Sequence, residues 1–147
     1  MFLLCICWLL FITWAPLSTS QQITGGFYHT CAVDAVYGSV YCWGSNQYGQ
    51  IGDGNTATTN RLTPTLVSGM SSGVSHIALG AYHSCALISS SGSMYCWGGN
   101  NNGQLGDGTT VEKFAPVMVS GMSSSVTALT TGLGHTCAIK LGGVLYC

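Results

Sequence analysis

Residues 83–108 contain three short stretches, HSCA (83–86), YCWG (95–98) and GQLGDG (103–108), which decide the fold because the same block recurs along the chain. An earlier copy reads HTCA (29–32), YCWG (41–44) and GQIGDG (49–54), and a later copy runs from HTCA (135–138) to YC (146–147). A period of 52 to 54 residues is typical of stacked repeat folds. The sequence therefore predicts two complete repeats and a truncated third.

Each repeat is expected to form a β-hairpin. Residues 83–88 and 93–97 are rich in strand-forming side chains, and the Ser-Ser-Ser-Gly stretch at 89–92 has turn chemistry. In the register that this spacing predicts, Cys85 faces Cys96.

The predicted turns differ between repeats. In the second repeat the register leaves Ser90-Ser91 as a two-residue turn. In the first it leaves Val36-Tyr37, a poor pair for such a turn, so we expect a wider loop there. Gly142-Gly143 favours a third kind of turn in the last repeat.

Stacking of repeats is expected from equivalent apolar positions. Ile23, Ile77 and Leu129 stand at the same place in successive repeats, before the Gly-x-x-His step. One repeat cannot cover such residues alone, whereas a neighbouring sheet can.

Charged residues make up 5% of the chain, far below the roughly 25% of ordinary soluble domains. The basic side chains are Arg61, Lys113 and Lys140. Because nucleic-acid binding relies on several Lys or Arg side chains, we exclude nucleic acid as a partner.

Residues 1–20 differ from the rest of the chain. An apolar run over residues 2–14 is broken only by Thr13, and small residues follow at Ser18 and Ser20. This run is shorter than the roughly twenty residues of a membrane span and fits a secretory signal peptide, which leaves 21–147 as the mature domain. Since no Lys or Arg lies near Met1, a signal anchor and a mistranslated upstream segment remain alternatives.

Cysteine usage agrees with secretion. Cys5 and Cys7 would leave with the signal, and six cysteines would remain. They form three pairs at hairpin spacing: Cys31 with Cys42, Cys85 with Cys96, and Cys137 with Cys147. Opposed residues of a hairpin are close enough for disulfides, and the secretory start favours them. The alternative is free cysteines buried in the core.

These motifs resemble the regulator of chromosome condensation repeat. The resemblance rests on GAYHSCAL (80–87), MYCWG (94–98) and NGQLGDGT (102–109), and it covers residues 23–147. It implies an all-β fold of β-propeller blades, usually seven of four strands each. Because a propeller protects its edges by closing the ring, we expect this chain to be a fragment of a longer gene product, unless several copies self-associate.

The recurring histidines are candidates for chemistry. His29, His83 and His135 each lie two residues before a cysteine. This spacing makes a metal site or a Cys–His nucleophile a hypothesis to consider. Each repeat, however, offers a single such histidine, and oxidised cysteines cannot bind metal. We predict structural histidines whose ring nitrogens bond backbone groups across repeats, and we expect no metal or cofactor.

The other recurring residues also favour structural roles. Asp53 and Asp107 offer one carboxylate per Gly-Asp-Gly loop, too few for calcium, so each is expected to bond its own turn. Trp43 and Trp97 are expected to pack between blades. The predicted binding residues lie in polar loops instead: Gln47, Tyr48, Asn100, Asn101 and Asn102.

The sequence thus predicts a secreted, non-catalytic β-propeller module that recognises an unidentified protein partner. One alternative is a guanine-nucleotide exchange factor for a small GTPase, the activity of the founding member of the resembled family. The other is a membrane-anchored extracellular propeller domain. Fold likeness alone cannot name the partner.

Overall fold

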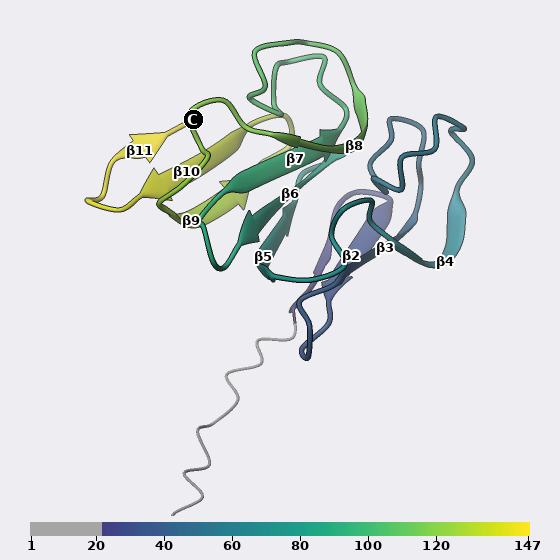
Figure 1. Cartoon of the computed structure of the whole chain (residues 1–147). Helices are drawn as coiled ribbons and strands as arrows, with labels where there is room; N and C mark the ends of the chain where they lie inside the picture. The colour runs from purple at the N-terminus through teal and green to yellow at the C-terminus, as the bar shows by residue number, and fades with distance from the viewer. Residues whose placement is uncertain (1–21) are drawn as a thin grey trace, which may run out of the picture.

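The computed structural model describes residues 22–147, which form three antiparallel sheets, one from each repeat (Figure 1). The first sheet contains β1 (Gln22–Gly25), β2 (His29–Val33), β3 (Val40–Gly44) and β4 (Arg61–Leu66). The second contains β5 (Val74–Leu79), β6 (His83–Ile88), β7 (Met94–Gly98) and β8 (Lys113–Met118). The third contains β9 (Val126–Thr131), β10 (Thr136–Lys140) and β11 (Leu145–Tyr146).

The strand order confirms the predicted propeller blades. Each complete sheet is a meander, with strands in the order β1-β2-β3-β4 or β5-β6-β7-β8, and no helix occurs in residues 22–147. Consequently no helix of this part could cross a membrane. The predicted signal peptide, residues 1–20, lies outside the described residues.

The hairpin register is as predicted. Cys85 pairs with Cys96, and the same register in the first sheet pairs Cys31 with Cys42. Because side chains alternate between the two faces of a strand, each cysteine pair lies on one face of its sheet.

The predicted two-residue turn at Ser90-Ser91 is wrong. The Ile88 amide donates to the Ser93 carbonyl at 2.9 Å, so the loop spans four residues. Gly92, the last of them, has φ of +66°, a left-handed conformation that glycine adopts at no steric cost and that returns the chain to β7.

The first repeat has the wider loop that was expected. There the Asp34 amide donates to the Ser39 carbonyl at 2.8 Å, and the Asp34 carboxylate accepts the Val36 amide at 2.8 Å. In the last repeat, the Lys140 amide donates to the Val144 carbonyl at 3.0 Å across a loop that holds Gly142-Gly143.

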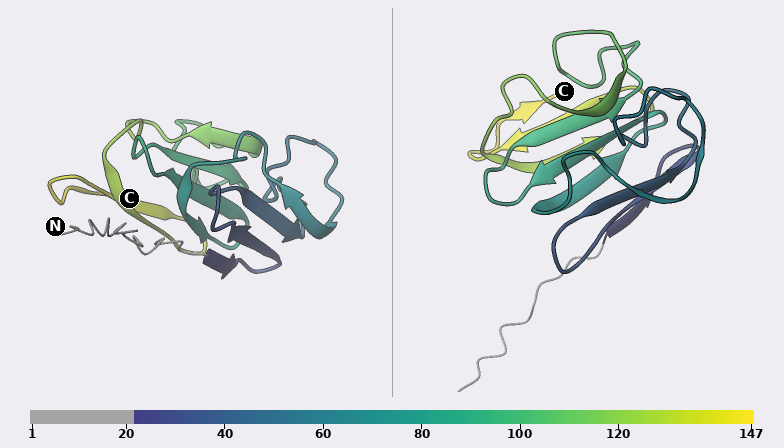
Figure 2. Two further views of the ribbon diagram at one scale, coloured as in Figure 1. Left: turned by 60° about the horizontal axis from the view of Figure 1, so that its bottom comes forward. Right: turned by 45° about the vertical axis from the view of Figure 1, so that its right-hand side comes forward.

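The sheets stack one on another (Figure 2). Apolar residues are buried between each sheet and the next. Ile77 is 3% exposed and Leu129 is 8% exposed, because each packs on the preceding sheet. Ile23 occupies the same position in the first sheet and is 72% exposed. This difference confirms that one repeat cannot bury its own apolar residues. Burying a side chain of this size contributes about 1.5–3 kcal/mol.

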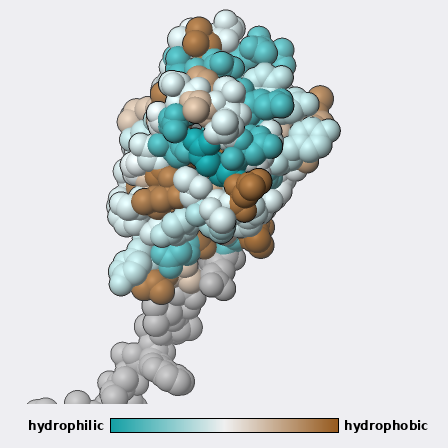
Figure 3. Space-filling model, turned by 90° about the vertical axis from the view of Figure 1, so that its right-hand side faces the viewer, coloured by the Kyte–Doolittle hydropathy of each residue, from teal (hydrophilic) through white to brown (hydrophobic). Residues whose placement is uncertain are grey.

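The outer face of the first sheet exposes more apolar surface than Ile23 alone. Tyr41 and Leu66, which share its row across the sheet, are also exposed. Seen from the side of this sheet, hydrophobic residues form several separate patches between neutral and hydrophilic ones (Figure 3). In the equivalent row of the second sheet, Ile77 and Ala86 are buried and Tyr95 is half-buried, whereas Met118 is as exposed as Leu66.

A disulfide closes each hairpin. The bonds join Cys31 to Cys42, Cys85 to Cys96, and Cys137 to Cys147, with Cα atoms 4.1 Å apart in every case. The first two bonds are fully buried between sheets, whereas Cys137 is half-buried and Cys147 is exposed.

This difference in burial predicts the order of reduction. Under mild dithiothreitol the Cys137–Cys147 bond should open first, because a thiolate must reach a sulfur atom before exchange can occur. Timed alkylation followed by peptide mass spectrometry measures the order. Labelling of Cys85 and Cys96 before Cys147 would contradict the described packing.

Candidate functional site

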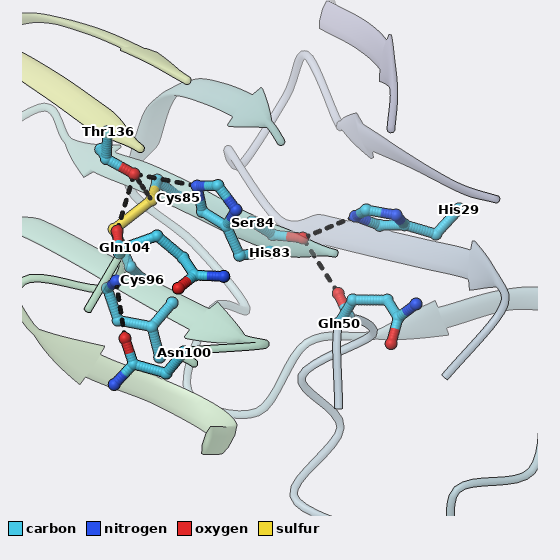
Figure 4. The surroundings of a disulfide bond; sticks show 10 residues. His29, Gln50, His83, Ser84, Cys85, Cys96, Asn100, Gln104 and Thr136 are labelled. Carbon is cyan, nitrogen blue, oxygen red and sulfur yellow. Dashed lines mark hydrogen bonds between the residues drawn. A yellow bond between two sulfur atoms is a disulfide. The ribbon is translucent and has the colours of Figure 1, made fainter. Parts of the chain in front are cut away.

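A hydrogen-bonded relay joins each sheet to the next (Figure 4). The Ser84 hydroxyl donates to the Gln50 carbonyl at 2.9 Å and lies 3.0 Å from His29 Nε2. Since the hydroxyl has a single proton, His29 Nε2–H must be the donor in the second bond. His29 and Gln50 belong to the first repeat and Ser84 to the second, so the relay crosses the junction twice.

The next junction repeats the arrangement. The Thr136 hydroxyl donates to the Gln104 carbonyl at 2.8 Å and accepts from His83 Nε2 at 2.9 Å. The histidines therefore bond across repeats, but through a side-chain hydroxyl. The prediction of a direct bond to the backbone is wrong. A hydroxyl from the next repeat, that of Ser84 or Thr136, lies between the histidine ring and the backbone carbonyl. His135, the third of the set, is exposed.

Burial keeps these two histidines neutral. It lowers the pKa of His29 and of His83 to about 4, and repulsion from the next histidine, His83 or His135, adds to the effect. Nδ1 of each ring has no hydrogen-bond partner within residues 22–147. A Cβ atom on Gly80 would overlap the His83 ring, which explains the glycine of the Gly-x-x-His step.

Residues 22–147 contain no cluster of side chains that could bind a metal ion. No group of three or more His, Cys, Asp or Glu side chains is placed to hold an ion there. The cysteines that follow His29, His83 and His135 are all in disulfides, so their sulfur atoms are not thiolates.

The Gly-Asp-Gly aspartates bond within their loops and also form ion pairs. Asp53 accepts the Asn55 amide at 3.0 Å and lies 2.6 Å from Arg61 Nε. Asp107 accepts the Thr109 amide at 2.9 Å and lies 3.3 Å from Lys113 Nζ. The ion pairs were not predicted, although Arg61 and Lys113 begin equivalent strands, which was a usable signal.

The two tryptophans differ in burial. Trp97 is fully buried at the first junction, where its indole N–H donates to the Gln50 carbonyl at 3.0 Å. Trp43, at the same position of the first sheet, lies on the outer face and is half-buried.

The predicted binding loops are only partly exposed. Gln47, Asn101 and Asn102 are exposed, and Tyr48 is half-buried. Asn100 is fully buried, so its assignment to a binding surface is wrong. Its side-chain oxygen accepts the Leu105 amide at 3.0 Å. The two protons of its NH₂ group are shared among Asp107 Oδ1 at 3.1 Å, the Thr109 carbonyl at 3.0 Å and the Val111 carbonyl at 3.1 Å.

Tyr48, a predicted binding residue, belongs to a cluster of aromatic rings whose other three members were not predicted. We call it the aromatic patch, and it consists of Phe27, Tyr28, Tyr48 and Tyr82. Ring centroids lie 6.2 Å apart for Phe27 and Tyr28, 5.9 Å for Phe27 and Tyr82, and 5.1 Å for Tyr48 and Tyr82. Tyr28 is 69% exposed and Phe27 57%. The sequence clue to this patch was the pair of variable residues in the Gly-x-x-His step, which are Phe27-Tyr28 in the first repeat and Ala81-Tyr82 in the second.

The patch draws on both complete repeats. The loop before β2 carries Phe27, the loop before β6 carries Tyr82, and the Phe27 amide donates to the Ala81 carbonyl at 3.4 Å. These loops and the one that carries Tyr48, residues 26–28, 80–82 and 45–50, contain no Asp, Glu, Lys or Arg. The surface is therefore aromatic and uncharged.

Stacked antiparallel sheets with a relay repeated at each junction define a protein of the β-propeller class. Two family models described as Regulator of chromosome condensation (RCC1) repeat match the chain. One matches residues 37–87 and 91–139, and the other residues 21–50 and 74–104. The chain therefore belongs to the RCC1 repeat family, as its motifs indicated.

Curated relatives share the repeat but are much longer. The probable E3 ubiquitin-protein ligase HERC4 of Homo sapiens is 38% identical over 125 residues, which are 84% of this chain and 12% of HERC4. The ultraviolet-B receptor UVR8 of Arabidopsis thaliana is 31% identical over 127 residues, 85% of this chain and 28% of UVR8. The chain thus spans a small part of either relative.

Solved structures agree on the fold. Prp20p of Saccharomyces cerevisiae superposes with a TM-score of 0.72 at 20% identity, over 85% of this chain and 32% of Prp20p. Human WBSCR16 superposes with a TM-score of 0.69 at 24% identity, over 82% of this chain and 31% of its own.

The relay histidines predict a pH-dependent stability. Their pKa is about 4 in the folded chain and about 6.5 when unfolded, so the unfolded state binds more protons between these values. The free energy of unfolding should therefore fall as the pH drops from about 6.5 to 4, by up to about 3 kcal/mol per histidine. Urea titrations at several pH values measure it.

The matched variant is His29→Gln with His83→Gln, which keeps an N–H donor and removes titration. It should be less stable than the parent at pH 7 but show a flatter pH profile. An unchanged slope between pH 6.5 and 4 would rule out these histidines as its source.

Proposed function

We propose that this chain is a secreted, non-catalytic recognition module whose aromatic patch binds a protein partner outside the cell. The observation that carries the proposal is the exposure of Phe27 and Tyr28, together with Tyr82, on loops without charged residues. Exposed aromatic side chains supply large contact area at low cost in conformational entropy. Isolated apolar residues on a surface need no explanation, whereas a contiguous aromatic cluster favours binding.

The character of the patch limits its partner. Edge-to-face packing holds Phe27 against Tyr82, and the Phe27 backbone is tied to the next repeat. The rings are thus held in place before binding, which lowers the entropy lost on association. Gln47, which directly precedes Tyr48 in the sequence, adds an amide group beside the patch. A neutral protein surface suits this chemistry better than an acidic or basic one.

Three disulfides within residues 22–147 support an oxidising compartment. The apolar segment 1–20 adds to this argument as a predicted signal peptide, with a membrane anchor as the alternative. Disulfides of this kind are rare in cytosolic and nuclear proteins.

Protein recognition is also consistent with the family. Prp20p is described by its binding properties to Gsp1p and histones. Likeness at 20% identity shows the fold and not the partner, so nucleotide exchange on a GTPase has family resemblance as its sole support. Ligase activity does not transfer from HERC4 either, since the chain spans 12% of that protein.

The test compares two pairs of neighbouring exposed residues at opposite ends of β2. The variant Phe27→Ala with Tyr28→Ala removes half of the aromatic patch. The control Val36→Ala with Tyr37→Ala removes side chains that are 73% and 71% exposed. The labelled 147-residue chain is recovered from the medium of a secreting culture and titrated onto intact cells, before and after mild trypsin treatment of the cells.

Saturable, trypsin-sensitive binding should weaken at least about tenfold in the patch variant and stay unchanged in the control, since a few aromatic residues dominate most interfaces. Equal binding by both variants would overturn the assignment of the patch. Retention of the chain inside the culture cells with free thiols would overturn secretion.

A further inference from the structure

A cavity of about 390 Å³ lies between the second and third sheets and has no assigned role. The residues that form its main wall are Met94, Gln104, Leu105, Gly106, Val119 and Met122. The cavity also touches Thr136 of the relay and the last residues of the chain, Tyr146 and Cys147. Its volume falls within the roughly 300–1,000 Å³ of small-molecule sites.

The same space one repeat earlier is filled by a tryptophan. There the equivalent wall residues are Val40, Gln50, Ile51, Gly52, Val67 and Met70. All six are buried, and the four apolar side chains among them share one core cluster with Trp97. A Cβ atom on Gly52 would overlap the Trp97 indole, so glycine at this position makes room for the ring.

The backbone carbonyl that accepts the Trp97 indole N–H also has a counterpart at the second junction. The Gln50 carbonyl accepts two hydrogen bonds, from the Ser84 hydroxyl at 2.9 Å and from the Trp97 indole N–H at 3.0 Å. In residues 22–147 the Gln104 carbonyl accepts one, from the Thr136 hydroxyl at 2.8 Å. A carbonyl oxygen has two lone pairs, so it can accept a second donor.

We propose that this cavity binds a tryptophan side chain, with the indole ring on Gly106 and the indole N–H donating to the Gln104 carbonyl. Gly106 has φ of +62° and lines the cavity, and a Cβ atom there would lie 3.0 Å from Val119 Cγ1. The apolar wall matches the ring, and the carbonyl selects an aromatic group with an N–H over one without.

The indole can be presented in two ways. Trp97 directly follows Cys96 in its own strand, so a tryptophan bonded to Cys147 would reach the cavity in the same way. A tryptophan on a separate polypeptide would bring the same ring. The chemistry is shared, and the experiment separates the sources.

The primary experiment titrates the 147-residue chain with N-acetyl-tryptophanamide and follows the backbone amide signals of Leu105 and Gly106 by NMR. Saturable shifts are expected at these residues. N-acetyl-phenylalaninamide should bind roughly fivefold more weakly, because it lacks the hydrogen bond to Gln104. Absence of saturable shifts with the tryptophan probe would overturn the proposal.

Two matched variants locate the binding. Gly106→Ala adds a Cβ atom to the cavity wall, 3.0 Å from Val119 Cγ1, and should weaken binding at least about tenfold. Gly121→Ala is the control, since its φ of +73° carries similar backbone strain and a Cβ there meets open space. Equal binding by the parent and both folded variants would place the probe elsewhere and contradict the proposal.

Two extended chains separate the sources. One adds Trp-Gly after Cys147 and the other adds Ala-Gly. If the Trp-Gly chain excludes the probe while the Ala-Gly chain binds it, the cavity accepts a tryptophan bonded to Cys147. If both chains bind the probe equally, a tryptophan bonded to Cys147 does not occupy the cavity, which leaves a separate polypeptide as the source.

Discussion

The hydrogen bonds from His29 to the Ser84 hydroxyl and on to the Gln50 carbonyl set how one sheet packs on the next. Apolar burial provides most of the stabilisation, but it is non-directional and would tolerate small slides between sheets. The relay removes that freedom because a buried donor or acceptor left without a partner costs about 1–3 kcal/mol. Its recurrence at His83 gives both junctions the same geometry.

The surface features follow from this stacking. When one sheet is placed on the next, the loops before β2 and β6 come together, and Phe27 meets Tyr82. The same placement brings Trp97 over Gly52 at the first junction and leaves a cavity beside Gly106 at the second. Recognition and structure thus use one repeated geometry, in which the relay recurs with Ser84 at one junction and Thr136 at the other.

Some of this arrangement could be predicted from the sequence and some could not. The spacing of Cys85 and Cys96 predicted the hairpin register, because residues opposed in a hairpin are related by simple counting. The histidines were predicted to bond backbone groups across repeats, but the hydroxyl between each ring and the carbonyl was missed, because the stacking of the sheets decides which side chain reaches the ring. The hydroxyl after each histidine was the available clue. Asn100 was misplaced since asparagine is common in exposed loops, although Asn46 at the equivalent position pointed to a shared structural role.

The relay is tested most directly by the position of the protons on the histidine rings. A long-range ¹H–¹⁵N correlation spectrum of the 147-residue chain at pH 6 reports the charge and tautomer of each imidazole. We expect His29 and His83 to be neutral, with the proton on Nε2, because each donates to a hydroxyl that has given its own proton to a carbonyl. Protonated rings at this pH, or neutral rings with the proton on Nδ1, would contradict the account.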